Sequence, residues 1–431
     1  MLRAPQPSRV FAMVSLPSRR VLSWALYDWG NSAFATVVMA GFFPIFFRDF
    51  WSSGEASPAI TLRLGLANGL ASLSIVLLAP VLGSIADVAG VRKRFLAAFA
   101  FLGIAATALL PLVREGMWAP AAVLYFLATV GFMGANVFYD ALLLPVAGRA
   151  RLDRVSALGY ALGYLGGGLL FALCVIVTLY PQGFGLPDAS AAVRLSFWMV
   201  AGWWLVFSVP LLLWVTEPPV AQRPQGWGRA VLAGFGQLAR TFHEVRRLRH
   251  VGLFLLAYWL YIDGVDTIVR MAVDYGRALG FDAQGLIVAL LVTQFVGFPA
   301  ALAFGHLGEH AGARTGIFVA LAAYCLITAW AVRLDSVWEF YALAVAVGLV
   351  QGGIQALSRS YYARMIPPDR TAEFFGFYNM LGKFAAVAGP VVVGLVGAWS
   401  GSARVGIASV GVFFVLGGLL LWRLPDPEAQ R

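Results

Sequence analysis

Six charged residues interrupt the long apolar runs of this 431-residue chain. They are Asp28, Asp140, Asp263, Asp266, Arg270 and Lys383. A charge near the middle of a lipid bilayer costs roughly 2.5–3.5 kcal/mol on insertion scales, so such residues are functional candidates by default. Four carboxylates stand against two cations, which leaves two carboxylates without an evident partner. We expect the surplus to bind a cationic group of a substrate or to carry protons.

Asp28 is the strongest of these candidates because it belongs to an internal repeat. An acid, a polar residue and a hydroxyl recur with an offset of 235 residues, as Asp28, Asn31 and Ser32 and then as Asp263, Asp266 and Thr267. A carboxylate moved out of water favours its protonated form, so it could take up and release a proton. We favour proton coupling or ammonium binding by Asp28, and a purely structural role is the alternative.

The two cations have candidate partners nearby. Asp266 and Arg270 are four residues apart, so on a helix they can pair on one face. The pair either lets the helix insert or serves as an outer gate or a site for a substrate carboxylate, which suits a bidentate guanidinium. Lys383 could pair with a carboxylate across a helix bundle, with snorkelling to the membrane surface as the alternative.

Uncharged polar residues in the same apolar runs complete the candidate site. They could hydrogen-bond a zwitterionic solute, although buried polar residues also join helices to one another. These residues are Asn31, Gln351, Gln355, Tyr378 and Asn379.

The composition requires these residues to be positioned by a membrane protein. Hydrophobic residues make up 60% of the chain, charged residues only 12%, and the mean hydropathy is +0.80. Soluble domains have roughly 45–50% apolar and about 25% charged residues. Cys174 and Cys325 both fall in apolar runs, so no disulfide framework is implied. A soluble enzyme, a disordered scaffold and a disulfide-stapled secreted domain are excluded.

Twelve apolar runs are long enough to cross a bilayer, which takes about 20 residues per helix. They lack the ten-residue alternation of membrane strands, so we predict an all-α integral membrane protein. The predicted spans are 21–47, 61–85, 95–113, 119–145, 156–180, 195–215, 251–275, 283–307, 316–332, 338–360, 374–398 and 404–423.

The basic residues predict the orientation. Of the 31 lysines and arginines, 22 fall in the N-terminal tail and every second connection, and only 7 on the opposite side. Arg359 is counted here with the first group. By the positive-inside rule both termini are cytoplasmic. The net charge of +10 therefore reflects topology and predicts no nucleic-acid partner. In a bacterium this would be a multi-pass protein of the plasma (inner) membrane.

The longest connection divides the chain into two six-helix halves. We expect a cytoplasmic tail at 1–20, a first half at 21–216, a cytoplasmic linker at 217–250, a second half at 251–424 and a cytoplasmic tail at 425–431. The linker ends in a basic stretch from Arg240 to His250. It is either a short amphipathic helix on anionic lipid or a solvated connection.

A second repeat lies after the second span of each half. Its glycine, acid, glycine and cation recur with an offset of 222 residues, as Gly83, Asp87, Gly90, Arg92 and Lys93 and then as Gly305, Glu309, Gly312 and Arg314. A carboxylate beside arginines can clamp helix ends, and glycines allow close approach. We interpret both copies as a cytoplasmic gate, with a cluster that only sets topology as the alternative. Two homologous halves are typical of alternating-access transporters.

The second copy also spells His306-Leu-Gly-Glu309-His310, an H-x-x-E-H protease signature. Zinc would need both histidines on one stable helical face and a third ligand. We expect the neighbouring glycines to disfavour a regular helix there. Since the repeat explains the same residues, we predict no metal site and no cofactor.

The first copy resembles the loop signature of the major facilitator superfamily. Longer stretches are similar to its vacuole-effluxer branch, whose bacterial members form the unknown major facilitator family. They are Ser23–Thr36, Arg154–Gly167, Tyr261–Ala272, Gln351–Ser360, Ile366–Pro368 and Glu373–Asn379. The resemblance implies a twelve-helix facilitator with a central cavity lined mainly by the first, fourth, seventh and tenth helices. It also implies amino acids as candidate substrates, while Asp140 departs from the asparagine expected there.

Together these features predict a secondary active transporter, not an enzyme, that moves a small polar organic solute by alternating access. Amino acids are the first candidate substrates, proton or ion coupling is expected, and the protein is expected to act as a monomer. The alternatives are an exporter of amphipathic or drug-like compounds, a non-transporting sensor with the same fold, and a membrane hydrolase. Against the hydrolase stands the lack of a histidine and serine constellation.

Overall fold

The computed structural model describes residues 17–55, 57–220, 224, 226–245, 248–278, 283–334 and 336–424. Within these ranges the side chains of 57–58, 242–245, 270–278, 283–284, 286, 384–387 and 403 are not described. Twelve helices in the described part are long and apolar enough to cross a membrane. The expected all-α fold with twelve spans is confirmed, and each predicted run coincides with one of them.

The first six spans form one half of the molecule. The first span is built of α1 (Arg19–Ala33), the π-helix η1 (Phe34–Phe42), α2 (Phe43–Phe46) and η2 (Phe47–Trp51). The others are α3 (Ser57–Ala89), α4 (Arg92–Leu109) with η3 (Leu110–Leu112), α5 (Trp118–Ala141) with α6 (Leu143–Ala147), η4 (Arg149–Arg151) with α7 (Leu152–Leu179), and, after η5 (Pro181–Phe184), α8 (Ala189–Trp214).

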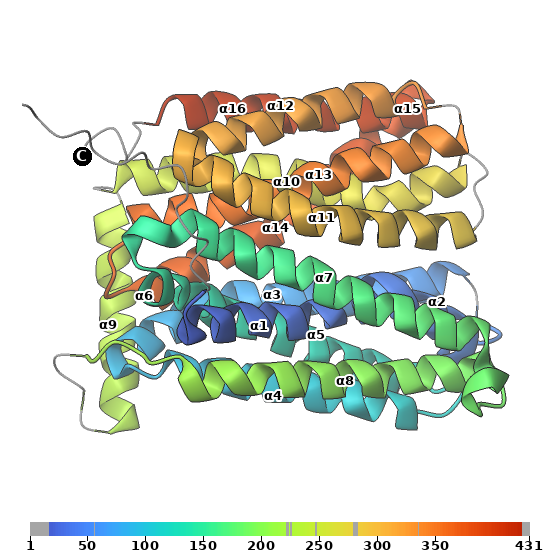
Figure 1. Ribbon diagram of the computed structural model, residues 1–431, viewed down its shortest axis with the longest axis horizontal. Coiled ribbons are helices and arrows are strands. Elements are labelled where there is room, and N and C mark those ends of the chain that lie inside the picture. The colour runs from blue at the N-terminus through green and yellow to red at the C-terminus, as the bar shows by residue number, and fades with distance from the viewer. Residues whose placement is uncertain are drawn as a thin grey trace, which may run out of the picture.

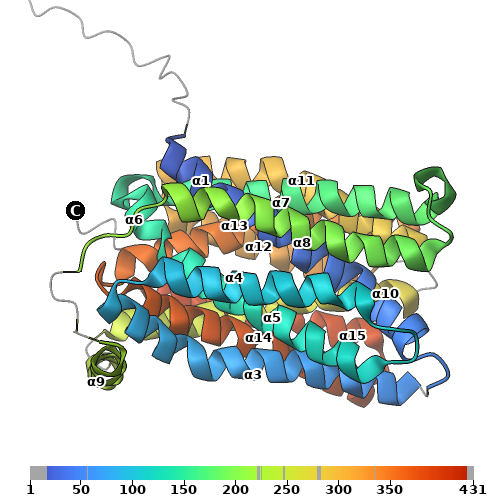
Figure 2. The same cartoon turned by 90° about the horizontal axis from the view of Figure 1, so that it is seen from below.

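The second half repeats this arrangement. It consists of α10 (Arg249–Ala278), α11 (Ala283–Ala311), α12 (Ala313–Ala331), α13 (Val337–Met365), α14 (Thr371–Ser400), and α15 (Ala403–Ala408) with α16 (Val410–Trp422). The linker between the halves contains α9 (Trp227–Val245). The spans run side by side along the longest axis, and α9 lies across one end of the bundle (Figures 1 and 2). We call this the α9 end and the opposite one the far end.

Equivalent helices pack in the same way in the two halves. A β carbon at Gly163 of α7 would stand 2.6 Å from Ser32 Oγ and 3.1 Å from Asp28 Oδ1 of α1. A β carbon at Gly389 of α14 would likewise stand 2.8 Å from Asp263 Oδ1 of α10. In each half, then, a glycine of the fifth span lets that helix approach the repeated acid of the first span.

The first span changes its winding beside the repeated acid. Six residues after Asp28, η1 continues α1 with π-type hydrogen bonds. Such segments inside α-helices frequently occur at functional sites. The wider turn places Thr36 at the interface with the other half, where Gln294 of α11 donates a hydrogen bond to its hydroxyl at 2.7 Å.

Candidate functional site

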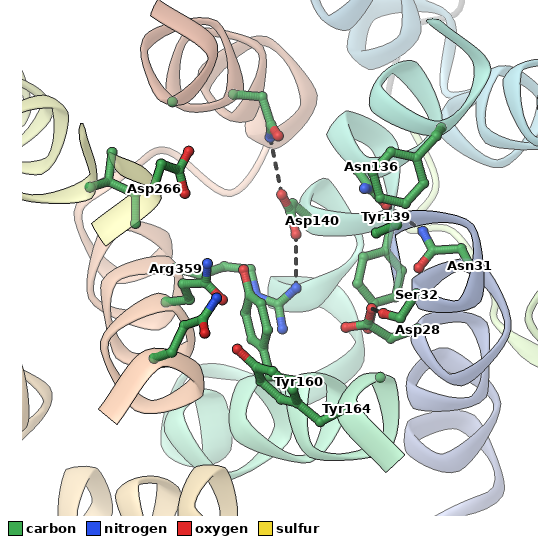
Figure 3. A pocket seen from close by; sticks show the side chains of 18 of the residues that line it. Asp28, Asn31, Ser32, Asn136, Tyr139, Asp140, Tyr160, Tyr164, Asp266 and Arg359 are labelled. Atoms are coloured by element: carbon green, nitrogen blue, oxygen red, sulfur yellow. Dashed lines mark hydrogen bonds and ion pairs between the residues drawn. The ribbon is translucent and has the colours of Figure 1, made fainter. Parts of the chain in front are cut away.

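A polar cavity of about 310 Å³ lies between the two halves, and side chains from both converge on it (Figure 3). Its lining comes from α1, α5 and α7 of the first half and from α10, α11, α13 and α14 of the second. Nine of the predicted site residues line it: Asp28, Asn31, Asp140, Asp266, Gln351, Gln355, Tyr378, Asn379 and Lys383.

Asp28 projects into this cavity from α1. Its carboxylate accepts hydrogen bonds from Ser32 Oγ at 2.9 Å and from the Tyr139 hydroxyl at 3.3 Å. Both donors are neutral, and no salt bridge to Asp28 is formed within the described residues. Asp28 is 9% exposed and lines the cavity, so a solute entering the cavity can reach its carboxylate.

Asp140 is held by the other half of the molecule. Arg359 Nη1 of α13 donates to Asp140 Oδ1 at 2.9 Å, and Asn379 Nδ2 of α14 donates to Oδ2 at 3.0 Å. The guanidinium also donates to Ser156 Oγ and to the Ser156 carbonyl, and it lies 4.3 Å from the centre of the Tyr160 ring. These contacts join α5 and α7 to α13 and α14 in the middle of the bundle (Figure 3).

Arg359 corrects the charge balance expected from the sequence. The count of basic residues places it in a connection, but α13 runs on to Met365 and Arg359 is only 2% exposed, at the wall of the cavity. A buried guanidinium needs a partner, and Asp140 supplies it. The intramembrane charges therefore include a third cation, and Asp140 is no longer one of the surplus carboxylates.

The other predicted charges divide into different environments. Asp263 is fully buried away from the cavity lining and accepts a hydrogen bond from the Gly389 amide at 2.9 Å. Its position in the repeat matches that of Asp28, but its carboxylate faces α14 instead of the cavity. Asp266 and Lys383 line the cavity from α10 and α14. The side chain of Arg270 lies outside the described residues, so its predicted pairing stays a prediction.

Several lining residues were not predicted from the sequence. Asn136 accepts a hydrogen bond from Asn31 Nδ2 at 2.5 Å, and Tyr139 stacks on Trp24 with ring centres 4.3 Å apart. The remaining unpredicted polar lining includes Ser32, Thr36, Tyr160, Tyr164, Tyr258 and Gln294. The spacing of Tyr160 and Tyr164 could have indicated these two, because residues four apart on a helix share one face.

A second chamber of about 220 Å³ adjoins the polar cavity. The two share Ala35, Thr36, Tyr164, Gln294 and Gln351, so the Thr36–Gln294 hydrogen bond stands between them. The rest of its lining is mostly apolar: Ala40, Ile268, Val269, Ala289, Leu290, Thr293, Phe340, Leu343, Ala344 and Val347.

The first copy of the gate motif fastens α3 to α14 at the α9 end. Asp87 accepts hydrogen bonds from the amides of Ala372 and Glu373, at 3.1 and 2.8 Å, and from Arg92 Nε at 2.5 Å. A carboxylate at a helix N-terminus is favoured by the unpaired amides and the helix dipole. Gly83 brings the helices together, since a β carbon there would collide with the backbone of Ala372.

The other residues of this copy fix the turn between α3 and α4. Gly90 has φ of +65°, a left-handed conformation that favours glycine. Glu217 accepts from the amides of Arg92 and Lys93, both at 2.9 Å, and Lys93 Nζ donates to the Val215 carbonyl at 2.5 Å. The beginning of the linker is thus tied to the first turn of α4.

The second copy does not repeat this clamp. Gly312 keeps the left-handed turn with φ of +84°, and Arg314 Nη2 donates to the carbonyl of Trp422 at 2.7 Å. Glu309 is exposed, and its carboxylate makes no hydrogen bond or ion pair with any other described residue. Gly305 serves close packing instead, since a β carbon there would stand 2.5 Å from Ala157 Cβ of α7.

The expectation that glycines break the helix around His306 is wrong. Helix α11 runs unbroken to Ala311, so Gly305 and Gly308 are tolerated inside it. They let α11 pack closely against α7, since a β carbon at either position would collide with a neighbouring side chain. The rings of His306 and His310 lie 4.0 Å apart. Across the described residues, no group of three or more histidine, cysteine or acidic side chains could hold a metal ion.

On the opposite side of the bundle, α7 and α13 are fastened by a different set of groups. Arg364 donates both terminal nitrogens to the Asp153 carboxylate, at 2.7 and 2.6 Å. Ser360 Oγ donates to the same carboxylate, and Ser156 Oγ donates to the Ala356 carbonyl at 2.7 Å. Such bidentate pairs are among the stronger polar contacts of proteins. Together with the Asp87 clamp they join the two halves at the α9 end.

Comparisons with known proteins agree with this arrangement. A family model described as "Vacuole effluxer Atg22 like" matches residues 64–151 and 147–431. The uncharacterized MFS-type transporter YxiO of Bacillus subtilis is 37% identical over 406 residues, which cover 94% of each chain. Autophagy-related protein 22-2 of Aspergillus clavatus is 28% identical over 267 residues, covering 56% of this chain and 43% of the fungal protein.

Solved structures share the fold at low sequence identity. The human organic anion transporter MFSD10 superposes with a TM-score of 0.73 at 16% identity, covering 94% of this chain and 99% of that one. The proton:xylose symporter XylE superposes with a TM-score of 0.66 at 13% identity, covering 96% and 97%. Both confirm the major facilitator fold with two six-helix halves. The chain belongs to the Atg22-like vacuole effluxer family and is a transporter of the major facilitator type, not an enzyme.

Proposed function

We propose that this protein is a secondary active transporter that moves a small polar organic solute by alternating access, with amino acids as the first substrates to test. The observation that carries the proposal is the environment of the Asp28 carboxylate. It borders a polar cavity between the halves and is hydrogen-bonded only by neutral hydroxyls among its described neighbours. In our proposal an ammonium group or a proton neutralises this carboxylate.

The surrounding polar groups support a zwitterionic solute. Gln351 and Gln355 of α13 line the same cavity and carry both donors and acceptors. Lys383 lines it as well, from α14, and supplies positive charge. A solute with an ammonium and a carboxylate would thus find complementary groups on both halves, which is what couples binding to their relative movement.

We also propose an orientation and a setting. The α9 end would face the cytoplasm, because the basic residues concentrate there. The parts that move would be the halves 21–216 and 251–424. The membrane would be the plasma membrane, as the bacterial relative suggests, and the protein would act there as a monomer. Labelling of an Arg94→Cys variant by an impermeant thiol reagent in right-side-out vesicles would contradict this orientation.

The test is uptake of labelled amino acids into proteoliposomes, with and without an imposed pH gradient. Asp28→Asn keeps the shape of the side chain but removes its charge. Asp263→Asn is the matched control, because it makes the same change at the equivalent repeat position outside the cavity lining. We expect gradient-driven accumulation that is lost in Asp28→Asn and retained in Asp263→Asn. Accumulation that survives in Asp28→Asn would remove Asp28 from the mechanism.

The second chamber favours one alternative, an exporter of amphipathic compounds. Its mostly aliphatic wall adjoins the polar cavity, so a molecule with a polar head and an apolar body would fill both. Absence of amino-acid flux above protein-free liposomes, together with flux of an amphipathic amine, would favour this alternative.

A further inference from the structure

Helix α9 occupies a position that the transport cycle has to disturb. It lies across the α9 end, roughly perpendicular to the spans and beside the ends of α3 and α14 (Figures 1 and 2). Its residues Ala230, Gly234, Leu238 and Thr241 are buried. Their spacing of three or four residues places them on one face of the helix. This face is packed against the bundle.

The first half of the molecule supplies one side of the seat of α9. Ser84 Oγ of α3 donates to the Gly234 carbonyl at 2.9 Å. Gly234 allows this approach, because a β carbon there would stand 2.6 Å from Ile85 Cγ1 and 3.0 Å from Ile85 Cα. Ser84 and Ile85 lie two or three residues from Asp87, the acid of the gate.

The second half supplies the other side. Gln237 Nε2 donates to Glu373 Oε2 at 2.6 Å, and Arg370 Nη1 donates to Thr241 Oγ1 at 3.5 Å. Glu373 is the same residue whose amide bonds to Asp87. Helix α9 therefore spans the seam between α3 and α14 at the point where the Asp87 clamp closes it.

The connections of α9 determine which contacts must break. Twelve residues, 215–226, separate it from α8, and three residues, 246–248, separate it from α10. Because Val215 and Glu217 are bound to the first turn of α4, nine residues of the first connection, 218–226, can extend, which at about 3.3–3.6 Å per residue gives a reach of about 30 Å; the second connection stays within about 15 Å. Helix α9 is thus tethered closely to the second half and loosely to the first. When the halves part at this end, its contacts with α3 are the ones to be lost.

We propose that α9 is a strap that holds the α9 end closed by packing Gly234 against α3, and that it moves away with the second half when this end opens. The outer face of the strap is free of such packing: Leu232 is 74% and Phe235 is 51% exposed, with Arg229 and Arg240 also exposed. The strap rests on the proposed alternating access, and its test below is independent of flux.

The test compares two glycines of the same helix. Gly234→Ala puts a methyl group against Ile85, whereas Gly236→Ala meets nothing within 4 Å. Both changes raise helix propensity equally. Spin labels at Arg151→Cys and His310→Cys, in a background with Cys174→Ala and Cys325→Ala, report the separation of the halves at the α9 end, where both positions are exposed.

We expect Gly234→Ala to raise the ratio of long to short distances by about tenfold, within the range of an overpacked contact, and Gly236→Ala to leave it unchanged. Ser84→Ala removes the hydrogen bond without adding atoms, so it tests the strap if Gly234→Ala does not fold, and it should shift the distances in the same direction. Equal distributions in Gly234→Ala, Ser84→Ala and Gly236→Ala would overturn the strap. Loss of flux with an intact distance shift would instead count against the proposed function alone.

Discussion

We predict that the charges of Asp140 and Arg359, and not only the hydrogen bond between them, determine how much this pair contributes to stability. At a charge separation of about 4 Å and an effective dielectric constant of about 20, the attraction is about 4 kcal/mol. Removing one partner of such a pair costs about 3–5 kcal/mol, because the other charge stays buried without compensation. Arg359 is 2% exposed and cannot lose its proton, and Asp140 is its salt-bridge partner among the described residues, so most of this penalty applies to Asp140→Asn.

The double variant Asp140→Asn/Arg359→Gln should recover most of the loss. Both side chains are then neutral, and both can still hydrogen-bond, so no charge is left unpaired. We expect a coupling energy of at least about 2 kcal/mol in the double-mutant cycle, which is within the range for contacting residues. Because the pair joins the two halves, each single variant should also lengthen the distances between Arg151→Cys and His310→Cys labels.

Thermal unfolding, followed by the fluorescence of the 14 tryptophans, provides the assay. We expect the apparent melting temperature to be highest for the wild type, lower for the double variant and lowest for Asp140→Asn. Glu55→Gln is the matched control, because Glu55 pairs with Arg63 at 3.2 Å but is 38% exposed. Exposed pairs contribute about 0–1 kcal/mol. A double variant less stable than either single variant, or an Asp140→Asn protein as stable as wild type, would refute the reasoning.

Two further substitutions test the gate and the site. Gly83→Ala should prevent closure of the α9 end and lengthen the label distances, whereas Gly69→Ala in the same helix meets nothing within 4 Å and should leave them unchanged; equal effects would refute the close-approach argument. Tyr139→Phe removes a hydrogen-bond donor to Asp28. Because such a bond contributes about 1 kcal/mol, the rate of transport should fall several-fold. Tyr125→Phe, which loses a bond to Asn68 instead, should transport normally, and a similar loss in both variants would indicate a general effect of the hydroxyl.

Hydropathy predicted a span at 338–360 that contains Arg359, but the count of basic residues placed this arginine in a connection. A window of apolar residues measures compatibility with lipid, and the stretch after residue 350 of α13 is polar. Side chains of α5, α7 and α10 contact that part of the helix instead of lipid, so it can carry Ser358, Arg359 and Ser360 in the interior. Burial between protein helices leaves no hydropathy signal, which is why the partner of Asp140 could not be found from the sequence.

The repeats predicted which residues are equivalent but not which ones act. Asp28 and Asp263 match in sequence and pack against equivalent glycines, yet only Asp28 lines the cavity. In the same way Asp87 forms a clamp with α14 while Glu309 is exposed. Two halves that descend from one repeat can diverge at any contact, and the divergence lies in the neighbours, which are far away in the sequence.

The sequence by itself determined the class of protein, the number of spans, the division into halves and nine of the 18 polar residues that line the cavity. These follow from the cost of placing charge in lipid and from spacing along single helices, both of which are local properties. Only the tertiary structure decided that Asp140 is neutralised by Arg359, that Asp28 keeps neutral partners, and that α9 straps the seam between α3 and α14. These depend on contacts between residues up to 219 positions apart, which are set by how the two halves pack.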